Sequence, residues 1–123
     1  MGDVIDYTME TIGIADLDAM TEEALDRLPF GVVGIDRDGI ARVYNRTEAE
    51  LAGLDQERIL GAHFFDTIAQ CMNNFMVAQR YEDEPALDAI VPFVLTLRMR
   101  PTPVRLRLLQ DPGSPLRYLI LKR

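Results

Sequence analysis

The sequence has 123 residues, of which 48% are hydrophobic, and a formal net charge of −7 at neutral pH. This composition excludes an intrinsically disordered chain, and the length fits one domain with one core. No apolar run reaches the roughly 20 residues that span a bilayer, and the single cysteine, Cys71, cannot form an internal disulfide. We therefore expect a cytoplasmic protein that binds no membrane and, being acidic without a basic cluster, no nucleic acid.

Residues 1–28 are expected to form an N-terminal helical cap. A helix is predicted from Thr21 to Leu28, because Thr-Glu-Glu-Ala offers a capping hydroxyl followed by acids in the first turn. The upstream apolar residues are too few for an independent core; they are Met9, Ile12, Ile14, Leu17 and Met20. The cap should therefore pack on the outer face of a sheet in the main domain, residues 29–123.

The main domain begins with a predicted hairpin. Strands are expected at residues 30–36 and 40–45, joined by Asp38-Gly39, a strong short-range hairpin signal. The segment Thr47-Glu48-Ala49-Glu50 matches a capping box, with Thr47 as the N-cap, and predicts a short helix that ends at Gly53.

Further short helical elements are expected before the remaining strands. Residues 54–61 form a loop or a helical turn, residues 64–69 form a short helical element, and a longer helix follows Asn74 and runs to Glu84. Pro85 then separates the helices from the last part of the chain.

Three strands are predicted at residues 89–99, 104–109 and 116–122. Pro92 indicates that the first of them lies at a sheet edge or has a bulge. Alternation with apolar residues places a set of arginines on the solvent-facing side of these strands; they are Arg98, Arg100, Arg105 and Arg107. Strands grouped apart from helices predict an α+β fold with an antiparallel sheet.

Tyr44 and Glu48 are the ionisable groups that could converge on Cys71. A lone cysteine is most often a small buried hydrophobe. Glu48 is equally explained as a first-turn acid near a helix N-terminus, and Tyr44 as an aromatic residue of the core. Spacing alone leaves open whether these three residues form one site.

His63 is the only histidine and lies eight residues before Cys71. One histidine and one cysteine fall short of a ligand set for a metal or haem. No third orienting group supports a catalytic Cys-His pair. We therefore expect neither a metal site nor an enzyme.

Several motifs resemble the photoactive yellow protein family, whose members are PAS-fold blue-light receptors. The resemblance runs from about Leu28 to the end of the chain, and it implies a five-stranded antiparallel sheet with short helices on one face. The residues that carry it are Leu28-Pro-Phe-Gly, Asp38-Gly39, Val43-Tyr44-Asn45 with Glu48, Leu51-Ala-Gly53, Ile59-Leu-Gly61, Phe64-Phe65 through Ala69 to Cys71, Arg100-Pro-Thr and Leu121-Lys-Arg123.

The resemblance implies that p-coumaric acid (4-hydroxycinnamic acid) is bound covalently as a thioester of Cys71. Tyr44 and Glu48 would donate hydrogen bonds to its phenolate oxygen, and Glu48 would be protonated because burial raises the pKa of a carboxyl group. After trans–cis isomerisation in light, proton transfer would leave Glu48 as a buried anion and loosen the N-terminal cap. The other implied chromophore-binding positions are Ala52, Leu54, Phe64, Ala69 and Gln70.

Three of these positions differ from the family pattern. The family usually has threonine, arginine and proline where this chain has Ala52, Leu54 and Gln70. A second hypothesis is therefore a PAS sensory or interaction module that has lost the chromophore or binds another ligand, such as haem. Under either hypothesis the signal passes to a downstream signalling protein that the sequence does not identify, and a homodimer stays open.

Overall fold

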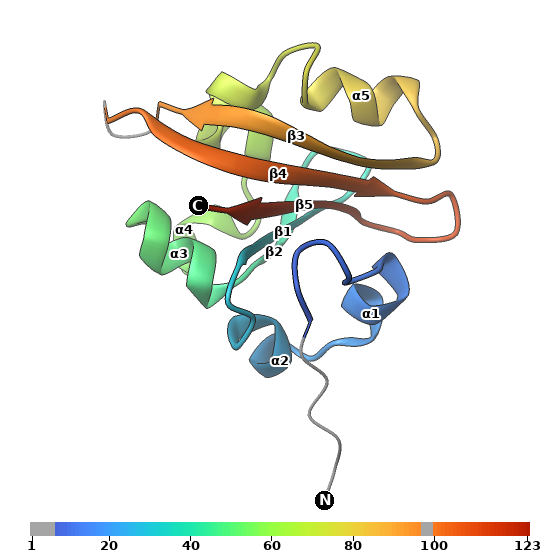
Figure 1. Cartoon of the computed structure of the whole chain (residues 1–123), viewed down its shortest axis with the longest axis horizontal. Helices are drawn as coiled ribbons and strands as arrows, with labels where there is room; N and C mark the ends of the chain where they lie inside the picture. Colours follow the sequence, from blue (N-terminus) through green and yellow to red (C-terminus); the bar gives the residue numbers. More distant parts are fainter. Residues whose placement is uncertain (1–6, 97–99) are drawn as a thin grey trace, which may run out of the picture.

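A five-stranded antiparallel sheet forms the centre of the computed structural model, which describes residues 7–96 and 100–123 (Figure 1). Its spatial order is β2-β1-β5-β4-β3. The strands are β1 (Gly31–Ile35), β2 (Ala41–Tyr44), β3 (Leu87–Leu95), β4 (Thr102–Gln110) and β5 (Arg117–Lys122). The predicted α+β class is confirmed. The end of the third predicted strand, residues 97–99, lies outside the described residues.

The hairpin between β1 and β2 turns at Gly39, whose φ of 87° lies in the left-handed region that glycine adopts readily. The closing strand β5 lies between β1 and β4, with Leu119 opposite both Val33 and Leu108. Strand β3 lies at the sheet edge, as Pro92 predicted, because proline cannot donate to a second neighbouring strand.

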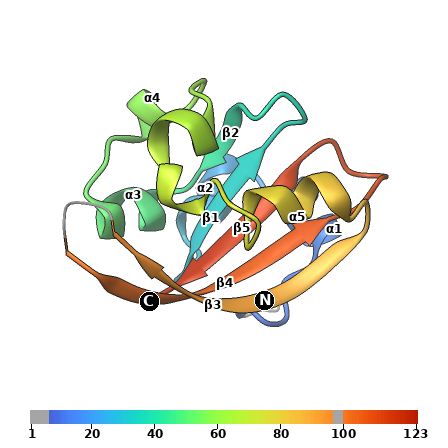
Figure 2. The same cartoon turned by 90° about the horizontal axis from the view of Figure 1, so that it is seen from above.

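Short helices cover both faces of the sheet. Figure 2 shows α3, α4 and α5 on one side of the curved sheet. The elements between β2 and β3 are α3 (Arg46–Ala52), α4 (Gln56–Ile59), the π-helix η1 (Phe64–Ile68), the 3₁₀ helix η2 (Gln70–Met72) and α5 (Ala78–Asp83). Among the residues described, no helix has the length and apolar character needed to cross a membrane.

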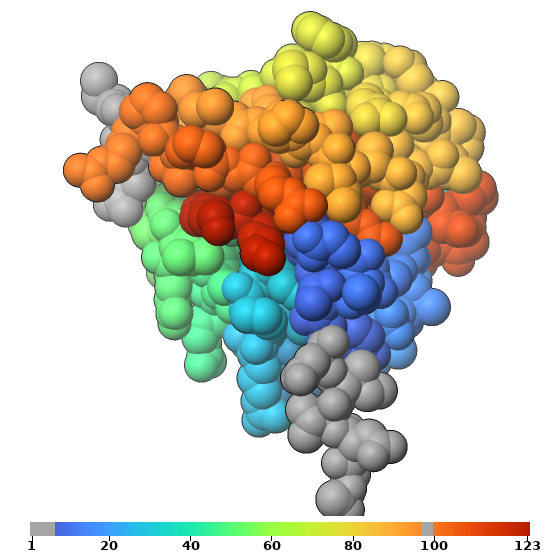
Figure 3. All heavy atoms as spheres, viewed as in Figure 1, coloured from blue at the N-terminus to red at the C-terminus, as the bar shows by residue number. Residues whose placement is uncertain are grey.

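The N-terminal cap packs on the other face, as predicted. It contains α1 (Ile14–Ala19) and α2 (Glu22–Asp26), and Thr21 caps α2 by accepting a hydrogen bond from the Ala24 amide. Cap residues share one hydrophobic cluster with sheet residues; these are Met9, Ile12, Leu17, Leu25, Leu28, Phe30, Val32, Leu109, Tyr118 and Ile120. Figure 3 shows the N-terminal segment lying against β4 and β5 on this side of the molecule.

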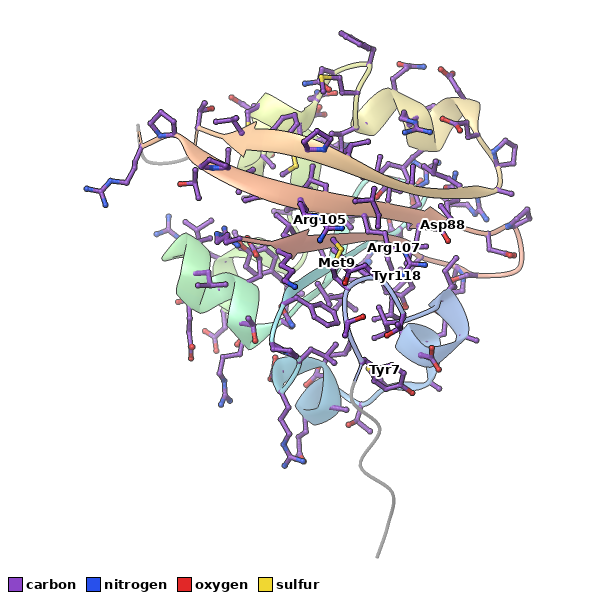
Figure 4. All side chains as sticks on the ribbon, in the orientation of Figure 1. Tyr7, Met9, Asp88, Arg105, Arg107 and Tyr118 are labelled. Carbon is purple, nitrogen blue, oxygen red and sulfur yellow. The ribbon has the colours of Figure 1, made fainter. Side chains whose placement is uncertain are left out.

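Arg107 is buried beneath the cap, which corrects the prediction that it faces solvent. From β4 its Nη1 donates to the carbonyl oxygens of Met9 and Ile12, at 2.9 and 2.6 Å (Figure 4). Its Nε and Nη2 donate to the Asp88 carboxylate on β3, at 2.9 and 3.0 Å. The prediction is wrong because the cap covers the outer face of β4 here, whereas Arg105, which pairs with Glu10, stays exposed.

Two predicted helix starts also need correction. Helix α3 has Asn45 as its N-cap instead of Thr47, so it begins two residues earlier than a Thr47 cap would allow, although it ends at Gly53 as predicted. Helix α5 begins at Ala78, because the Asn74 side chain accepts hydrogen bonds from two following amides and forms a separate turn.

Candidate functional site

Tyr44 and Glu48 lie at the junction of β2 and α3. Tyr44 is the last residue of β2 and pairs opposite Val33, and Glu48 follows in the first turn of α3. Both residues are buried, Tyr44 being 4% exposed and Glu48 3%. Glu48 lies so close to β1 that a Cβ atom on Gly31 would overlap its carboxylate. The glycine at this position therefore permits the carboxylate to pack against the sheet.

Asn45 organises this junction, and its cap role was not predicted. Its Oδ1 accepts from the amides of Glu48 and Val32, at 3.1 and 2.9 Å. Its Nδ2 donates to the carbonyl oxygens of Leu25 and Phe30, at 2.8 and 3.0 Å. One buried amide side chain thus joins α3, β1 and the N-terminal cap. An asparagine directly before a helix is a capping signal that could have been recognised in the sequence.

The Glu48 carboxylate accepts two hydrogen bonds from the Arg123 guanidinium, at 2.7 and 3.1 Å. The Arg123 side chain is only 18% exposed. Burial raises the pKa of Glu48 above its ordinary value, and the hydrogen bonds and charge of Arg123 oppose this rise without cancelling it. Sequence reasoning missed Arg123, because the two residues meet only when Leu121 of β5 pairs with Gly31 of β1.

The Tyr44 hydroxyl is a protonated donor at neutral pH. Burial is the main cause that raises the pKa of Tyr44, nearby Glu48 raises it further, and Arg123 lowers it. None of the residues that the structure describes accepts a hydrogen bond from this hydroxyl. Tyr44 therefore places a donor beside the Glu48 carboxyl group.

Cys71 lies in η2 as a half-buried free thiol. It packs at the edge of a hydrophobic cluster that includes Tyr44, Phe64 and Ala69, and Leu54 packs against the same cluster. The structure thus brings five of the predicted site residues to one cluster. Glu48 is near enough to Tyr44 for its charge to raise the pKa of the Tyr44 hydroxyl.

The remaining two predicted positions lie differently. Ala52 is buried on α3 and is not a member of that cluster. The Gln70 side chain is exposed, and its Nε2 donates to the Asp66 carbonyl oxygen at 2.6 Å. This hydrogen bond connects η2 to η1, and the Gln70 amide group lies at the surface and not in the cluster.

His63 has a local structural role at the start of η1. Its Nδ1 accepts a hydrogen bond from the Asp66 amide at 3.2 Å. Within residues 7–96 and 100–123, no group of three or more histidine, cysteine, aspartate or glutamate side chains is arranged to hold a metal ion.

The sequence matches the family model described as PAS fold over residues 19–121. It is 28% identical over 107 residues to a photoactive yellow protein of Rhodothalassium salexigens, covering 85% of this chain and 86% of that protein. A photoactive yellow protein of Halochromatium salexigens is 25% identical, again over 85% of this chain and 86% of that protein.

The structure is similar to the crystal structure of the photoactive yellow protein domain of the sensor histidine kinase Ppr from Rhodospirillum centenum. The TM-score is 0.81 at 30% identity, and the match covers 89% of this chain and 98% of that domain. A PAS domain of an HTR-like protein from Haloarcula marismortui has a TM-score of 0.62 at 18% identity, a likeness of fold alone.

Proposed function

The chain belongs to the PAS family and, within it, to the photoactive yellow proteins, and we propose that it is a blue-light sensor that carries p-coumaric acid on Cys71. This is a family of sensory domains and not of enzymes. The observation that carries the proposal is the buried pair of Tyr44 and Glu48, two polar groups close to a cluster that has a free thiol at its edge.

The residues present fit a hydroxycinnamoyl group. The Cys71 thiol can form a thioester, and Phe64, Ala69 and Leu54 supply apolar surface in or against the cluster on which it packs. The Tyr44 hydroxyl is protonated, and burial favours the neutral form of Glu48, so both can donate to a phenolate oxygen. Hydrogen bonds to a charged acceptor are strong, which suits a phenolate taken out of water.

When bound, p-coumaric acid supplies light absorption and trans–cis isomerisation about its double bond. In the dark Tyr44 Oη and the protonated Glu48 carboxyl would hold the phenolate oxygen, while the apolar cluster excludes water. In the light Glu48 would give up its proton to that oxygen and be left as a buried carboxylate. Burial makes this negative charge costly even beside Arg123, so the surrounding contacts would rearrange.

The N-terminal cap is the proposed output element. Asn45 bonds to the Glu48 amide and also to the Leu25 carbonyl oxygen in α2, so a change at the start of α3 acts on the cap through one side chain. We propose residues 1–28 as a detachable cap on a PAS domain of residues 29–123. Its release would signal to a downstream protein, and we further propose a cytoplasmic location, with a homodimer as one form of assembly.

Reconstitution tests the proposal directly. Apoprotein mixed with an activated ester of p-coumaric acid is expected to gain one coumaroyl group on Cys71, seen by peptide mass spectrometry, together with a visible absorption band. Cys71→Ala should gain neither, and Tyr44→Phe and Glu48→Gln should shift the band. An unmodified Cys71 without a visible band would refute the proposal. A Soret band after addition of haem, lost in His63→Ala, would instead support the alternative of a haem-binding PAS module.

A further inference from the structure

The ion pair of Glu48 and Arg123 joins the first turn of α3 to the end of β5, 75 residues apart in the chain. The guanidinium contacts both carboxyl oxygens, at 2.7 and 3.1 Å, in the fork geometry that would stabilise an ionised carboxylate. Because Glu48 is 3% exposed, water contributes little to solvating its charge. Arg123 is therefore the group that makes a negative charge on Glu48 tolerable.

Two opposing effects meet at this carboxyl group. Burial favours the neutral acid and raises the pKa of Glu48, whereas Arg123 favours the carboxylate. Among the described residues, Arg123 is the charged group that acts on Glu48, and the neighbouring Tyr44 hydroxyl on β2 stays protonated. Burial is the larger of the two effects on the pKa of Glu48, and the contact with Arg123 is the one that opposes it.

The neighbouring cation Lys122 lies on the opposite side of β5. It pairs with Arg105 across the sheet and is exposed, and its charge acts on Glu10 of the N-terminal cap. Successive residues of a strand point to opposite faces. Lys122 thus carries the same charge one residue away without touching Glu48, and it provides a matched control.

We propose that Arg123 is the counterion of Glu48 and stabilises the carboxylate that remains when Glu48 gives its proton to the phenolate oxygen of the chromophore. This inference rests on the proposed light-sensing function. The proton leaves a Glu48 carboxyl oxygen and binds the phenolate oxygen, while the guanidinium keeps its own charge and donates two hydrogen bonds. Arg123 is a positioning residue, because it acts through Glu48 and not on the chromophore.

The first experiment uses the apoprotein and does not depend on the chromophore. The Glu48 carboxyl carbon is titrated by NMR in the wild type, Arg123→Gln, Arg123→Lys and Lys122→Gln, with Glu48→Gln used to assign the signal. Arg123→Gln should move the titration midpoint to higher pH, Arg123→Lys should move it less, and Lys122→Gln should leave it in place. Equal midpoints in all four proteins would overturn the proposal. Arg123→Lys keeps the charge, so it serves as the folded variant should Arg123→Gln unfold.

The second experiment uses the reconstituted holoprotein. After a light flash, infrared difference spectra report how much Glu48 has lost its proton. Arg123→Gln should lower the equilibrium constant for this transfer by roughly tenfold or more, because two charge-assisted hydrogen bonds to the anion are lost. Lys122→Gln should match the wild type, and an unchanged yield in Arg123→Gln would overturn the proposal.

The two experiments separate the two proposals. If no coumaroyl adduct forms, the proposed function fails, and the apoprotein titration then decides only whether the ion pair controls Glu48. In that case the role of Arg123 in proton transfer is overturned as well. If the adduct forms and Arg123→Gln transfers its proton normally, the light-sensing function stands and the counterion role fails.

Discussion

Replacing Arg107 by methionine should detach the N-terminal cap from the sheet. Methionine keeps an unbranched apolar stem but cannot donate to the carbonyl oxygens of Met9 and Ile12. Both hydrogen bonds are buried, and leaving a buried acceptor unpaired costs about 1–3 kcal/mol. The ion pair with Asp88 adds at most about 1 kcal/mol, because the Asp88 side chain is 61% exposed.

The expected total loss is roughly 2–7 kcal/mol, a large part of the 5–15 kcal/mol that stabilises a typical domain. The assay combines urea denaturation with amide hydrogen exchange. Protection of the Leu17 and Leu25 amides in the cap should fall first, because residues 7–26 can open while the sheet stays folded. The amide of Leu119 in the central strand β5 should lose protection only with global unfolding.

Two control variants test the reasoning behind this magnitude. Asp88→Asn weakens the ion pair and leaves the bonds to the cap, so it should cost no more than about 1 kcal/mol. Arg105→Gln removes a second cap contact, the exposed ion pair with Glu10, and should also lower the free energy of unfolding by no more than about 1 kcal/mol. The reasoning is refuted if Arg107→Met is as stable as Asp88→Asn, or if exchange in the cap does not change.

Three further predictions concern the junction of β2 and α3. Asn45→Ala should lower the free energy of unfolding by roughly 2–5 kcal/mol, since four hydrogen bonds of a buried amide are lost; thermal or urea denaturation measures this, and a loss under about 1 kcal/mol would contradict it. Gly31→Ala should cost roughly 1–3 kcal/mol and displace the Glu48 carboxylate from Arg123, which the NMR signal of Glu48 would report, whereas an unperturbed signal would show that the overlap is relieved elsewhere. Glu48→Gln should gain stability relative to the wild type as pH rises from acidic to neutral. Burial raises the pKa of Glu48 in the folded state. The protonated carboxyl group therefore contributes stability below the unfolded pKa, and this contribution is lost as pH rises through the folded pKa. A stability difference between Glu48→Gln and the wild type that is the same at every pH would contradict this.

Local signals predicted much of the fold. Asp38-Gly39 marked the first hairpin, and Pro92 marked an edge strand, because turn conformation and the loss of a backbone donor are properties of single residues. The same is true of Gly53, whose φ of 69° ends α3. These features depend on neighbours in the chain and need no knowledge of distant contacts.

Signals that overlap in the sequence were resolved only by distant contacts. Asn45 and Thr47 can both cap a helix, and the structure selects Asn45 because its side chain also bonds to Leu25, Phe30 and Val32. Thr47 instead donates to the Leu28 carbonyl oxygen. Alternation along β4 separated two faces correctly, but it could not show that the outer face at Arg107 is covered by the cap.

The sequence by itself determined the α+β class and most strand and turn positions, because these rest on periodicity and turn chemistry. It was the resemblance to a known family that joined Tyr44, Glu48 and Cys71 as one candidate site. Only the tertiary structure decided which charges meet. Arg123 reaches Glu48 through the pairing of β5 with β1, and Arg107 reaches Met9 and Ile12 through the docking of the cap. Pairing register and burial arise from contacts between distant segments, and they set the electrostatic environment of a buried carboxyl group.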